Sequence, residues 1–427
     1  MLEQILREID GNRDEIIRGL QKLIQMESSD GKATTAQEFV ENMLQSMGFT
    51  TECFREDPRS TQLPDYAPYD FEYDPNAYNV AGVRIGCGNI PSMMLFAHID
   101  TETAHYFGSF ENPYHSEIRD GKIYGLGACD DKGGVAMMLY AVKYLLKFVP
   151  ELPYDLCVMS ILGKHGCGFG TLSALVKGYT GKNSIYLHPA ETGHGFGEIK
   201  NISLGLVDLD LSVRGLPAIA HDDLSTGANA AVRIGYIATY LEEFNRICRK
   251  KYCFDFGSFR GQPSFILNIG SICADGGYGS ISRSASMKIR CRFYSPLTIQ
   301  SVIDALKQFL RQRCLEDGIV PFEDITIKMG PMRATPAMVD TDSSIVRLIK
   351  NNITRITGIQ DFIHQYHGGS DIRLPILYGN SQCVGIGPAC VLPERESGQM
   401  EWMSIEDYIN GVKILASILY EYRNFRD

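Results

Sequence analysis

The chain has 427 residues, and its 41 lysines and arginines against 51 aspartates and glutamates give a net charge of −10. This acidic balance excludes a typical nucleic-acid binder, which needs a basic surface. Hydrophobic residues make up 44% of the chain and charged residues 22%, as in an ordinary globular protein, and no apolar run is long enough to cross a bilayer.

The N-terminal segment has the spacing of a helix and not the pattern of a signal peptide. Leucines and isoleucines recur every three or four residues between 2 and 26, with a predicted break near Gly11. No basic region followed by an apolar stretch begins the chain. The 12 cysteines are scattered and include no C-x-x-C pair. We therefore expect reduced thiols and a cytoplasmic protein.

Between residues 34 and 188, short apolar runs alternate with helical patterns. A helix is predicted over 34–47, and residues 54–78, rich in Pro, Asp and Tyr, predict a long ordered loop. The alternation that follows is typical of βαβ units, so we predict an α/β fold with a mixed central sheet and helices on both faces. The expected strands are 79–85, 92–97, 155–162 and 184–188, and the expected helices are 132–147 and 170–178.

At residue 203 the pattern changes. The run S-L-G-L-V-D-L-D-L-S-V-R alternates apolar and polar residues, as a strand with one solvated face does. We predict an inserted α+β domain over 203–332 and assign 1–202 and 333–427 to one catalytic domain. The insert is expected to hold strands at 203–214, 264–273 and 284–294 and helices at 229–248 and 297–314, and the chain is expected to end in a helix at 404–423.

A histidine and an aspartate follow the predicted strand 92–97. In M-M-L-F-A-H-I-D, His98 and Asp100 are two residues apart, a spacing that puts both side chains on one face of a strand. Ligands bind at the carboxyl ends of strands in open α/β sheets. A carboxylate beside a histidine is also the usual companion of a metal-bound imidazole. Taken alone, the pair is better explained as two polar residues that close a strand.

Two adjacent acids precede the predicted helix 132–147. The segment Y-G-L-G-A-C-D-D-K-G-G contains Asp130 and Asp131 in a glycine-rich turn. Aspartate favours helix N-termini, so a cap explains one of the two acids well. The second acid and the flanking glycines indicate a tight backbone at a functional site.

Together, the two segments are far more specific than either alone. H-x-D, then about thirty residues, then G-x-G-A-x-D-D-K-G-G resembles the zinc-dependent exopeptidase and deacylase family, which includes acetylornithine deacetylase, succinyl-diaminopimelate desuccinylase, aminoacylase and carboxypeptidase G. The segments G-L-P-A-I-A-H, H-G-G-S-D-I-R and E-W-M-S-I-E-D-Y resemble later family motifs in the same order. The resemblance covers nearly the whole chain. It implies the predicted α/β fold and a homodimer that pairs through the inserted domain.

The resemblance also implies roles for individual residues. In the family, two zinc ions share a bridging aspartate, and a glutamate acts as general base toward the bridging water. His98 matches the first ligand and Asp130 the bridge, while Asp100 matches the acid that supports the site.

Four positions depart from the family pattern. Lys164 stands where the base glutamate is expected, and His165 stands at the next ligand position. His188 occupies the place of a later acidic ligand, which a shifted alignment would give to Glu191. Ser397 stands at the position of the C-terminal histidine ligand.

These departures remove carboxylates that would balance two dications. We therefore expect one divalent metal, with zinc as the first candidate, or none, and histidine remains a good zinc ligand. The expected ligands are His98, Asp130 and His188, with His165 as a further candidate. In the alternative interpretation, His165 and His188 are neutral, hydrogen-bonded residues of a degenerate site. Lys164 would act as the base in its neutral form, or its ammonium would replace the charge of one metal.

The substrate-binding residues follow from the same resemblance. His221 matches a histidine that reaches the partner's active site and stabilises the oxyanion. Asn229 matches a family position but is equally well explained as a helix N-cap. Arg292 matches an arginine that pairs with a substrate carboxylate. Four residues of the H-G-G-S-D-I-R segment are further expected contacts: Gly368, Gly369, Ser370 and Arg373.

Three hypotheses for the function remain open at this point. The first is a metal-dependent amidohydrolase, either a deacylase or a small-peptide peptidase, that acts on an N-acyl amino acid or peptide. The second is a catalytically degenerate member of the family that binds a small carboxylate ligand or a partner without hydrolysis. The third is chemistry of the Lys164 amine itself on a carbonyl. In each case we expect no nucleic-acid or membrane partner.

Overall fold

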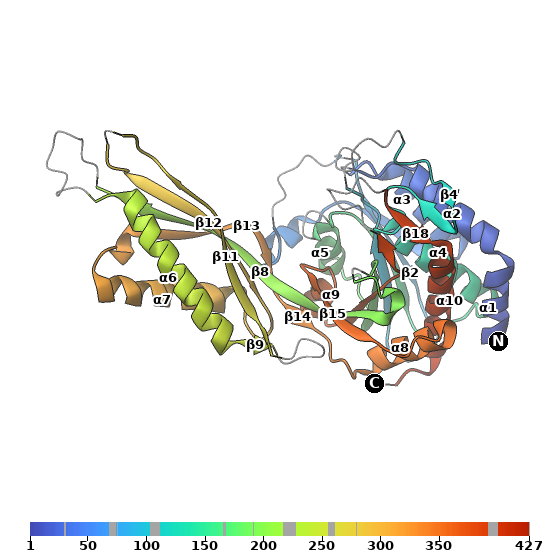
Figure 1. The fold of residues 1–427 in the computed structure, drawn as a ribbon. Helices are drawn as coiled ribbons and strands as arrows, with labels where there is room; N and C mark the ends of the chain where they lie inside the picture. The colour runs from blue at the N-terminus through green and yellow to red at the C-terminus, as the bar shows by residue number, and fades with distance from the viewer. Residues whose placement is uncertain are drawn as a thin grey trace. The chain divides into compact units, whose positions relative to one another are not determined.

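The computed structural model describes residues 1–29, 31–67, 74, 76–102, 112–164, 168–190, 192–216, 228–254, 261–278, 280–391 and 400–426 (Figure 1). These residues form two compact units. The first, called here the main unit, comprises Met1–Ile202, Met338–Tyr366 and Asp371–Asp427. The second, called the inserted unit, comprises Ser203–Ala337 and His367–Ser370.

The main unit is built on a mixed sheet with the strand order β1-β2-β6-β3-β7-β16. Strand β3 runs parallel to both β6 and β7, and β16 runs parallel to β7, while β1 and β2 are antiparallel to their neighbours. The carboxyl ends of β3, β6, β7 and β16 therefore share one edge of the sheet. The bounds are β1 (Thr50–Phe54), β2 (Asn79–Arg84), β3 (Met93–His98), β6 (Leu156–Ile161), β7 (Asn183–Leu187) and β16 (Gln382–Ile386).

Helices cover both faces of this sheet, as the sequence predicted. In β3, Met93 and Leu95 join the large core beneath α4 and α10, whereas Met94 and Phe96 join a smaller core on the opposite face. Figure 1 shows α4 and α10 on one side of the sheet and α5 and α9 on the other. The helices are α1 (Leu2–Gly11), α2 (Arg13–Gln25), α3 (Thr34–Ser46), α4 (Lys132–Phe148), α5 (Phe169–Val176), α8 (Ser344–Thr357), α9 (Arg373–Tyr378) and α10 (Ile405–Glu421). The predicted break near Gly11 is confirmed.

A small four-stranded sheet lies beside the turn that leads into α4. Its order is β17-β18-β5-β4, and Trp402 in β18 pairs with Tyr124 in β5. This pairing brings the residue before β18, Glu401, next to the glycine-rich turn at 125–131. The bounds are β4 (Ile118–Arg119), β5 (Lys122–Tyr124), β17 (Cys390–Val391) and β18 (Trp402–Ser404).

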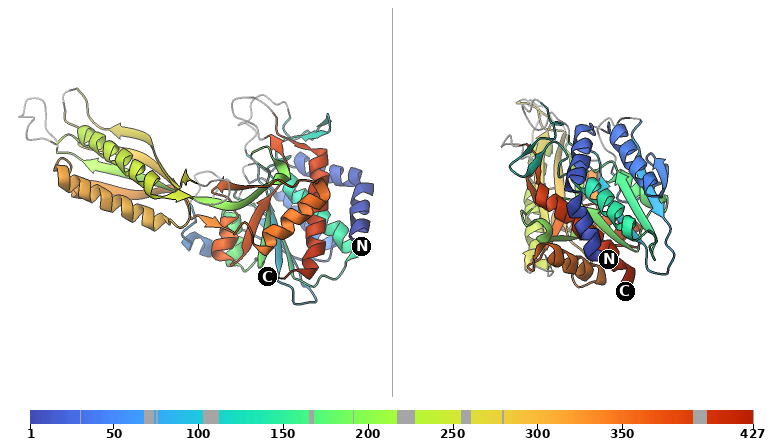
Figure 2. Two further views of the ribbon diagram at one scale, coloured as in Figure 1. Left: turned by 60° about the horizontal axis from the view of Figure 1, so that its bottom comes forward. Right: turned by 90° about the vertical axis from the view of Figure 1, so that its right-hand side faces the viewer.

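The inserted unit is an antiparallel sheet of β11, β12, β8 and β13 with two helices, α6 and α7. The predicted alternation is confirmed, because Leu209, Leu211 and Val213 are buried whereas Asp210 and Ser212 are exposed. In Figure 2 both helices lie alongside the strands. The bounds are β8 (Glu198–Arg214), α6 (Ala230–Lys251), β11 (Phe265–Ala274), β12 (Ser284–Phe293), α7 (Ile299–Asp317) and β13 (Ile325–Ala334).

Some elements differ from the sequence predictions. Strand β8 begins at Glu198, five residues before the predicted start at 203, and β1 and β13 were not predicted. The first part of β8 contains buried polar residues, which break the alternation on which the prediction relied. The remaining short elements are the strands β9 (Cys253–Phe254), β10 (Gln262–Pro263), β14 (Ala337–Met338) and β15 (Ile363–Gly368) and the 3₁₀ turns Pro58–Gln62, Gly195–Gly197, Phe322–Asp324 and Tyr422–Asn424.

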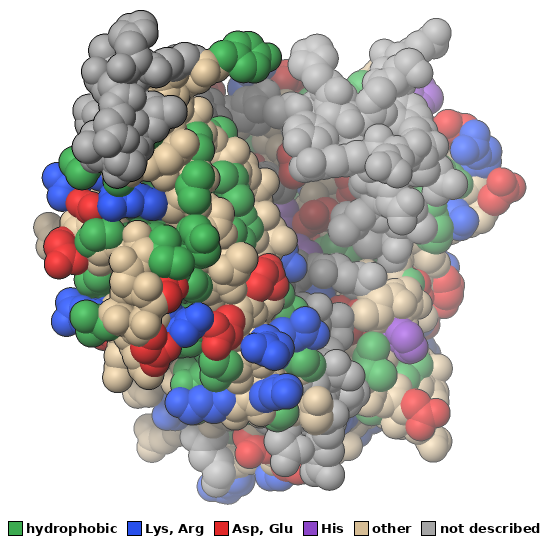
Figure 3. Space-filling view, turned by 60° about the vertical axis from the view of Figure 1, so that its left-hand side comes forward, with side chains coloured by type: hydrophobic (Ala, Val, Ile, Leu, Met, Phe, Trp, Pro, Cys, Tyr) green, Lys and Arg blue, Asp and Glu red, His purple; other side chains and the backbone are tan. Residues whose placement is uncertain are grey.

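The surface is that of a mixed-charge protein. Figure 3 shows acidic and basic side chains side by side over the visible face of the molecule, with hydrophobic side chains between them. Among the helices that the structure describes, none combines the length and the apolar composition needed to span a membrane.

Candidate metal centre

His98 is the last residue of β3, and its imidazole is fully buried. Its Nδ1 lies 2.9 Å from the backbone oxygen of Asp100 and 3.5 Å from Oδ1 of the same residue. The other carboxylate oxygen of Asp100 accepts the backbone N–H of Gly163 at 3.0 Å, just after β6. Asp100 thus fixes the ring of His98 through Nδ1 and directs Nε2 toward the carboxyl edge of the sheet.

Asp130 meets His98 from the turn before α4. Its Oδ1 lies 2.8 Å from Nε2 of His98. The turn is held by Glu401, whose buried carboxylate accepts the backbone N–H groups of Gly127 and Cys129 at 2.7 Å each and that of Asp130 at 2.8 Å. Burial raises the pKa of Glu401 to about 7. Sequence reasoning used Glu401 only as part of a family motif and missed its contact with the turn.

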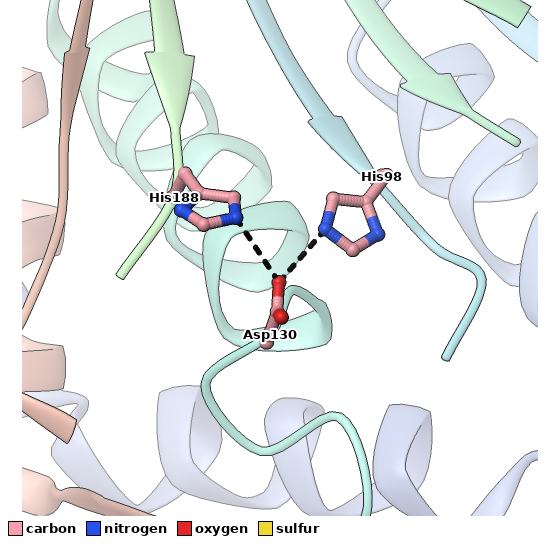
Figure 4. Close-up of side chains that lie close together, drawn as sticks. All are labelled: His98, Asp130 and His188. Carbon is pink, nitrogen blue, oxygen red and sulfur yellow. Dashed lines mark hydrogen bonds and ion pairs between the residues drawn. The ribbon is translucent and has the colours of Figure 1, made fainter. Parts of the chain in front are cut away.

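His188 approaches the same aspartate oxygen from the neighbouring strand. It directly follows β7, which is parallel to β3, and its Nε2 lies 3.3 Å from Asp130 Oδ1. The two imidazole rings are 5.9 Å apart between centroids. Figure 4 shows the three side chains converging, and one potential ligand atom from each lies within 4.8 Å of the others. The structure therefore brings together three of the predicted ligands, His98, Asp130 and His188.

This donor set fits one divalent cation. Two imidazole nitrogens and one carboxylate oxygen are ligands that zinc accepts. A tetrahedral zinc with bonds of about 2.1 Å keeps its ligand atoms roughly 3.4 Å apart, which is close to the separations of 2.8 and 3.3 Å observed at Asp130 Oδ1. The contact of His98 Nδ1 with a backbone oxygen is the usual support of a metal-bound histidine.

The electrostatic environment also favours a positive charge at this point. Burial by itself lowers the pKa of His98, but its hydrogen bonds to Asp100 and Asp130 outweigh burial and hold that pKa well above its usual value. Asp131, which is joined to Asp130 by a cis peptide bond, is fully buried, and burial raises its pKa well above the usual range. A cation between His98 and Asp130 would take the place of the proton that these groups retain.

Lys164 lies beside the buried ring of Tyr186. Its Nζ is 5.8 Å from the centroid of the Tyr186 ring, and that ring is 5.3 Å from the ring of His188. Tyr186 is buried, and burial together with nearby Asp371 raises the pKa of its hydroxyl well above the usual value. Tyr186 therefore has both the lysine and the histidine as neighbours.

Lys200 is a second residue that sequence reasoning missed. Its Nζ lies 2.9 Å from Nδ1 of His188, donates to the backbone oxygen of Pro189, and is 3.8 Å from the carboxylate of Glu198. Lys200 and Glu198 are both buried. The one signal in the sequence is the pair of charged residues in E-I-K, which comes just before an uncharged run, N-I-S-L-G-L-V, in the same strand up to Asp208.

The remaining predicted site residues have separate environments. Asn229 is the N-cap of α6, and its side chain accepts the N–H of Ala231 at 2.9 Å. In the inserted unit, Arg292 lines a cavity of about 610 Å³ together with Lys288 and Arg290. The following predicted residues lie outside the described part of the chain: His165, Glu191, His221 and Ser397.

The H-G-G-S-D-I-R segment contributes a buried ion pair. The side chain of Arg373 is 1% exposed, and its Nε lies 3.4 Å from the buried carboxylate of Asp65, which also accepts a hydrogen bond from Tyr378 at 2.6 Å. Gly368 ends β15, Gly369 has a positive φ of 68°, and Ser370 is buried. The substrate roles of these residues stay predictions, and Arg373 has an internal partner that the sequence did not indicate.

Comparison with known proteins gives a family match over most of the chain. The model of "Peptidase family M20/M25/M40" matches residues 94–421. An N-formyl-4-amino-5-aminomethyl-2-methylpyrimidine deformylase from Halalkalibacterium halodurans is 26% identical over 200 residues, which are 45% of this chain and 42% of the deformylase. A succinyl-diaminopimelate desuccinylase from Rickettsia typhi is 32% identical over 130 residues, 30% of each chain. The matched segments thus span less than half of either relative.

Solved structures match the fold over nearly its full length. A tripeptidase from Staphylococcus aureus superposes with a TM-score of 0.72 and 15% identity, covering 97% of this chain and 99% of the tripeptidase. Human carnosine dipeptidase 1 gives a TM-score of 0.63 at 16% identity and covers both chains completely. At these identities the superpositions show the fold, and they confirm the predicted α/β class.

Proposed function

Because the chain belongs to peptidase family M20/M25/M40, we propose that it is a metal-dependent amidohydrolase that cleaves an amide bond of an N-acyl amino acid or a short peptide. The family is the one that the sequence resemblance predicted, so that prediction is confirmed. One observation carries the proposal for this chain. Two histidine nitrogens and one carboxylate oxygen converge at the carboxyl edge of the sheet, where ligands bind in α/β folds.

We propose that His98, Asp130 and His188 hold one divalent cation, with zinc as the first candidate. A bound cation of this kind polarises the substrate carbonyl and lowers the pKa of a bound water. Asp130 is the one carboxylate of the described cluster, which matches a single dication better than two. His165 stays a predicted further ligand.

The chain's own residues would supply the remaining steps. Asp100 fixes the ring of His98, so the nitrogen Nε2 keeps its direction during turnover. Lys164, in its neutral form, would accept a proton from the attacking water and return it to the leaving amine, as a general base and then a general acid. His221 would stabilise the oxyanion, and Arg292 would pair with a substrate carboxylate.

The names of the relatives indicate the general class of substrate. The names of the sequence relatives describe the removal of formyl and succinyl groups, and those of the structural neighbours describe tripeptide and dipeptide cleavage. All four names denote cleavage of the carbonyl–nitrogen bond of an amide. For this chain we therefore propose an N-acyl amino acid or a short peptide as substrate, and binding without hydrolysis gains no support from these relatives.

We further propose a homodimer that pairs through the inserted unit, Ser203–Ala337, with a small molecule as its substrate partner. The proposal rests on the family resemblance. Light scattering over a range of protein concentrations tests it. A mass of about twice 47.6 kDa supports pairing, whereas a concentration-independent mass near 47.6 kDa would exclude it and with it the action of His221 on a partner site.

The first experiment measures metal content. Protein purified without chelator is incubated with excess zinc, desalted and analysed for elements, and we expect about one ion per chain. His188→Ala should lose that ion, while His115→Ala, which removes an exposed histidine outside the cluster, should keep it.

The wild-type protein is then assayed for release of amino groups from N-formyl, N-acetyl and N-succinyl amino acids and from dipeptides. The proposal would be contradicted if the protein remained free of zinc after incubation with excess zinc. It would also be contradicted if the protein bound metal but hydrolysed none of these substrates.

A further inference from the structure

Nδ1 of His188 faces two groups that make opposite demands on it. Lys200 Nζ lies 2.9 Å away, and the backbone oxygen of Pro189 lies 3.3 Å away. A carbonyl oxygen only accepts hydrogen bonds, so it needs a hydrogen on Nδ1. An ammonium only donates, so it needs a lone pair on Nδ1. Both demands cannot be met by one tautomer of the neutral ring.

The surroundings of Lys200 favour the ammonium as donor. Besides its contact with His188, Nζ donates to the Pro189 oxygen and lies 3.8 Å from the buried carboxylate of Glu198. The Pro189 carbonyl oxygen and the Glu198 carboxylate thus lie near the Nζ of a lysine whose side chain is 1% exposed. Its aliphatic stem packs against Gly385, where a Cβ would come within 3.0 Å of Lys200 Cβ. The lysine therefore has a defined position, from which it donates to the Pro189 oxygen.

The hydrogen bond at Nδ1 of His188 also determines whether Nε2, on the other side of the ring, carries a hydrogen. If Nδ1 accepts from Lys200, the hydrogen of the neutral imidazole resides on Nε2. Nε2 lies 3.3 Å from Oδ1 of Asp130, so it can donate this hydrogen to that carboxylate. A nitrogen that carries a hydrogen has no lone pair for a metal. His98 differs, because its Nδ1 faces a backbone oxygen and carries the hydrogen itself.

We propose that Lys200 is a positioning residue that holds His188 in the Nε2–H tautomer and thereby weakens binding of the divalent cation. The proposal rests on the proposed metal site for its second half only. Cation binding at Nε2 requires the ring hydrogen to move to Nδ1, with the ring's proton count unchanged. It also requires Lys200 to release Nδ1, whose hydrogen is then donated to the Pro189 oxygen. A metal-bound histidine with its other N–H on a carbonyl is the usual arrangement.

The tautomer is measured directly by nuclear magnetic resonance. Protein with ¹⁵N-labelled histidine is prepared free of metal, and the imidazole nitrogens are correlated with the ring carbon-bound protons, with His188→Gln used to assign the signal. We expect the Nε2–H pattern in the wild type and the Nδ1–H pattern in Lys200→Met. The matched control, Lys182→Met, removes an exposed lysine of the same unit and should leave the wild-type pattern. An Nδ1–H pattern in the wild type overturns the proposal, even if Lys200→Met does not fold.

Zinc affinity tests the second half. Competition with a chelating dye should show zinc bound about tenfold more tightly by Lys200→Met than by the wild type, the size typical of changes in the outer shell of a metal site. Equal or weaker binding by the variant overturns this half. If neither protein binds zinc, the proposed metal site fails, but the histidine tautomers still decide the role of Lys200. The two failures are therefore distinguishable.

Discussion

The carboxylate of Glu401 accepts the backbone N–H of Asp130 at 2.8 Å, although the two residues are 271 positions apart. The same carboxylate also accepts two other N–H groups of the turn. These three hydrogen bonds to a buried acid define the backbone from which the Asp130 side chain reaches the two histidines. The geometry of the candidate metal centre thus depends on a residue that does not belong to it.

Glu401→Gln should therefore affect both the fold and the metal site. The amide has one oxygen in place of two, and its NH₂ group would face N–H donors. We expect the free energy of unfolding at pH 8 to fall by about 1.5–3 kcal/mol, the size of hydrogen bonds to charged groups, and zinc affinity to fall with it. Urea unfolding and dye competition measure the two effects. Glu406→Gln, at an exposed surface pair with Arg13, is the control. Equal stability of both variants would contradict the role of Glu401.

A second prediction concerns the buried ion pair of Arg373 and Asp65. Both side chains are at most 1% exposed. Removing one partner of a buried ion pair costs about 3–5 kcal/mol, because the remaining buried charge loses that partner. Asp65→Asn should show a loss of this size in urea unfolding. Glu421→Gln, which removes an acid from the half-exposed pair with Arg355, should lose less than about 1 kcal/mol. If Asp65→Asn is as stable as that control, the pair has no structural role.

A third prediction tests Lys164 as the base. Lys164→Ala should keep its zinc and lower kcat by about 10²–10⁴-fold, the usual contribution of a general base. Lys182→Ala, at an exposed lysine, should keep wild-type activity. Full activity in Lys164→Ala would remove the lysine from the mechanism. Activity that appears only in Lys164→Glu would mean that the native chain is not a hydrolase of these substrates.

The three converging residues were predicted from the family resemblance, and the structure shows why they meet, because each lies at the end of a regular element. His98 ends one apolar strand, His188 follows another, and Asp130 precedes an apolar helix. Parallel neighbouring strands end at the same edge of a sheet, so residues at those ends lie close together. The α/β fold could be predicted because strong apolar periodicity defined most helices and strands.

The supporting residues could not be predicted from local pattern. Glu401 and Lys200 act through burial and through partners on other elements, and neither property is visible in the neighbouring residues. Asp65 lies in a segment without periodicity, 308 positions before Arg373. The start of β8 was missed because its buried face contains polar residues whose partners become apparent only in three dimensions.

A final prediction concerns pH and a histidine outside the metal centre. His364 lies between Lys350, whose Nζ is 2.8 Å from Nε2, and Asn201, whose Oδ1 is 3.0 Å from Nδ1. Burial, and then the charge of Lys350, lower the pKa of His364 from 6.5 to about 4. Between these two pH values the unfolded chain binds a proton that the folded chain does not. The contribution of His364 to the free energy of unfolding is therefore present above pH 6.5 and is lost as the pH falls toward 4.

Urea unfolding of the wild type and of His364→Gln at several pH values between 4 and 6.5 isolates this contribution. The glutamine cannot titrate, so the variant should lose less stability on acidification, and the difference between the two proteins should grow smaller as the pH falls. Lys350→Met should also reduce the pH dependence, because removing the cation lets the pKa of His364 rise toward its ordinary value. Parallel curves for the wild type and His364→Gln would show that this histidine titrates alike in the folded and unfolded chains.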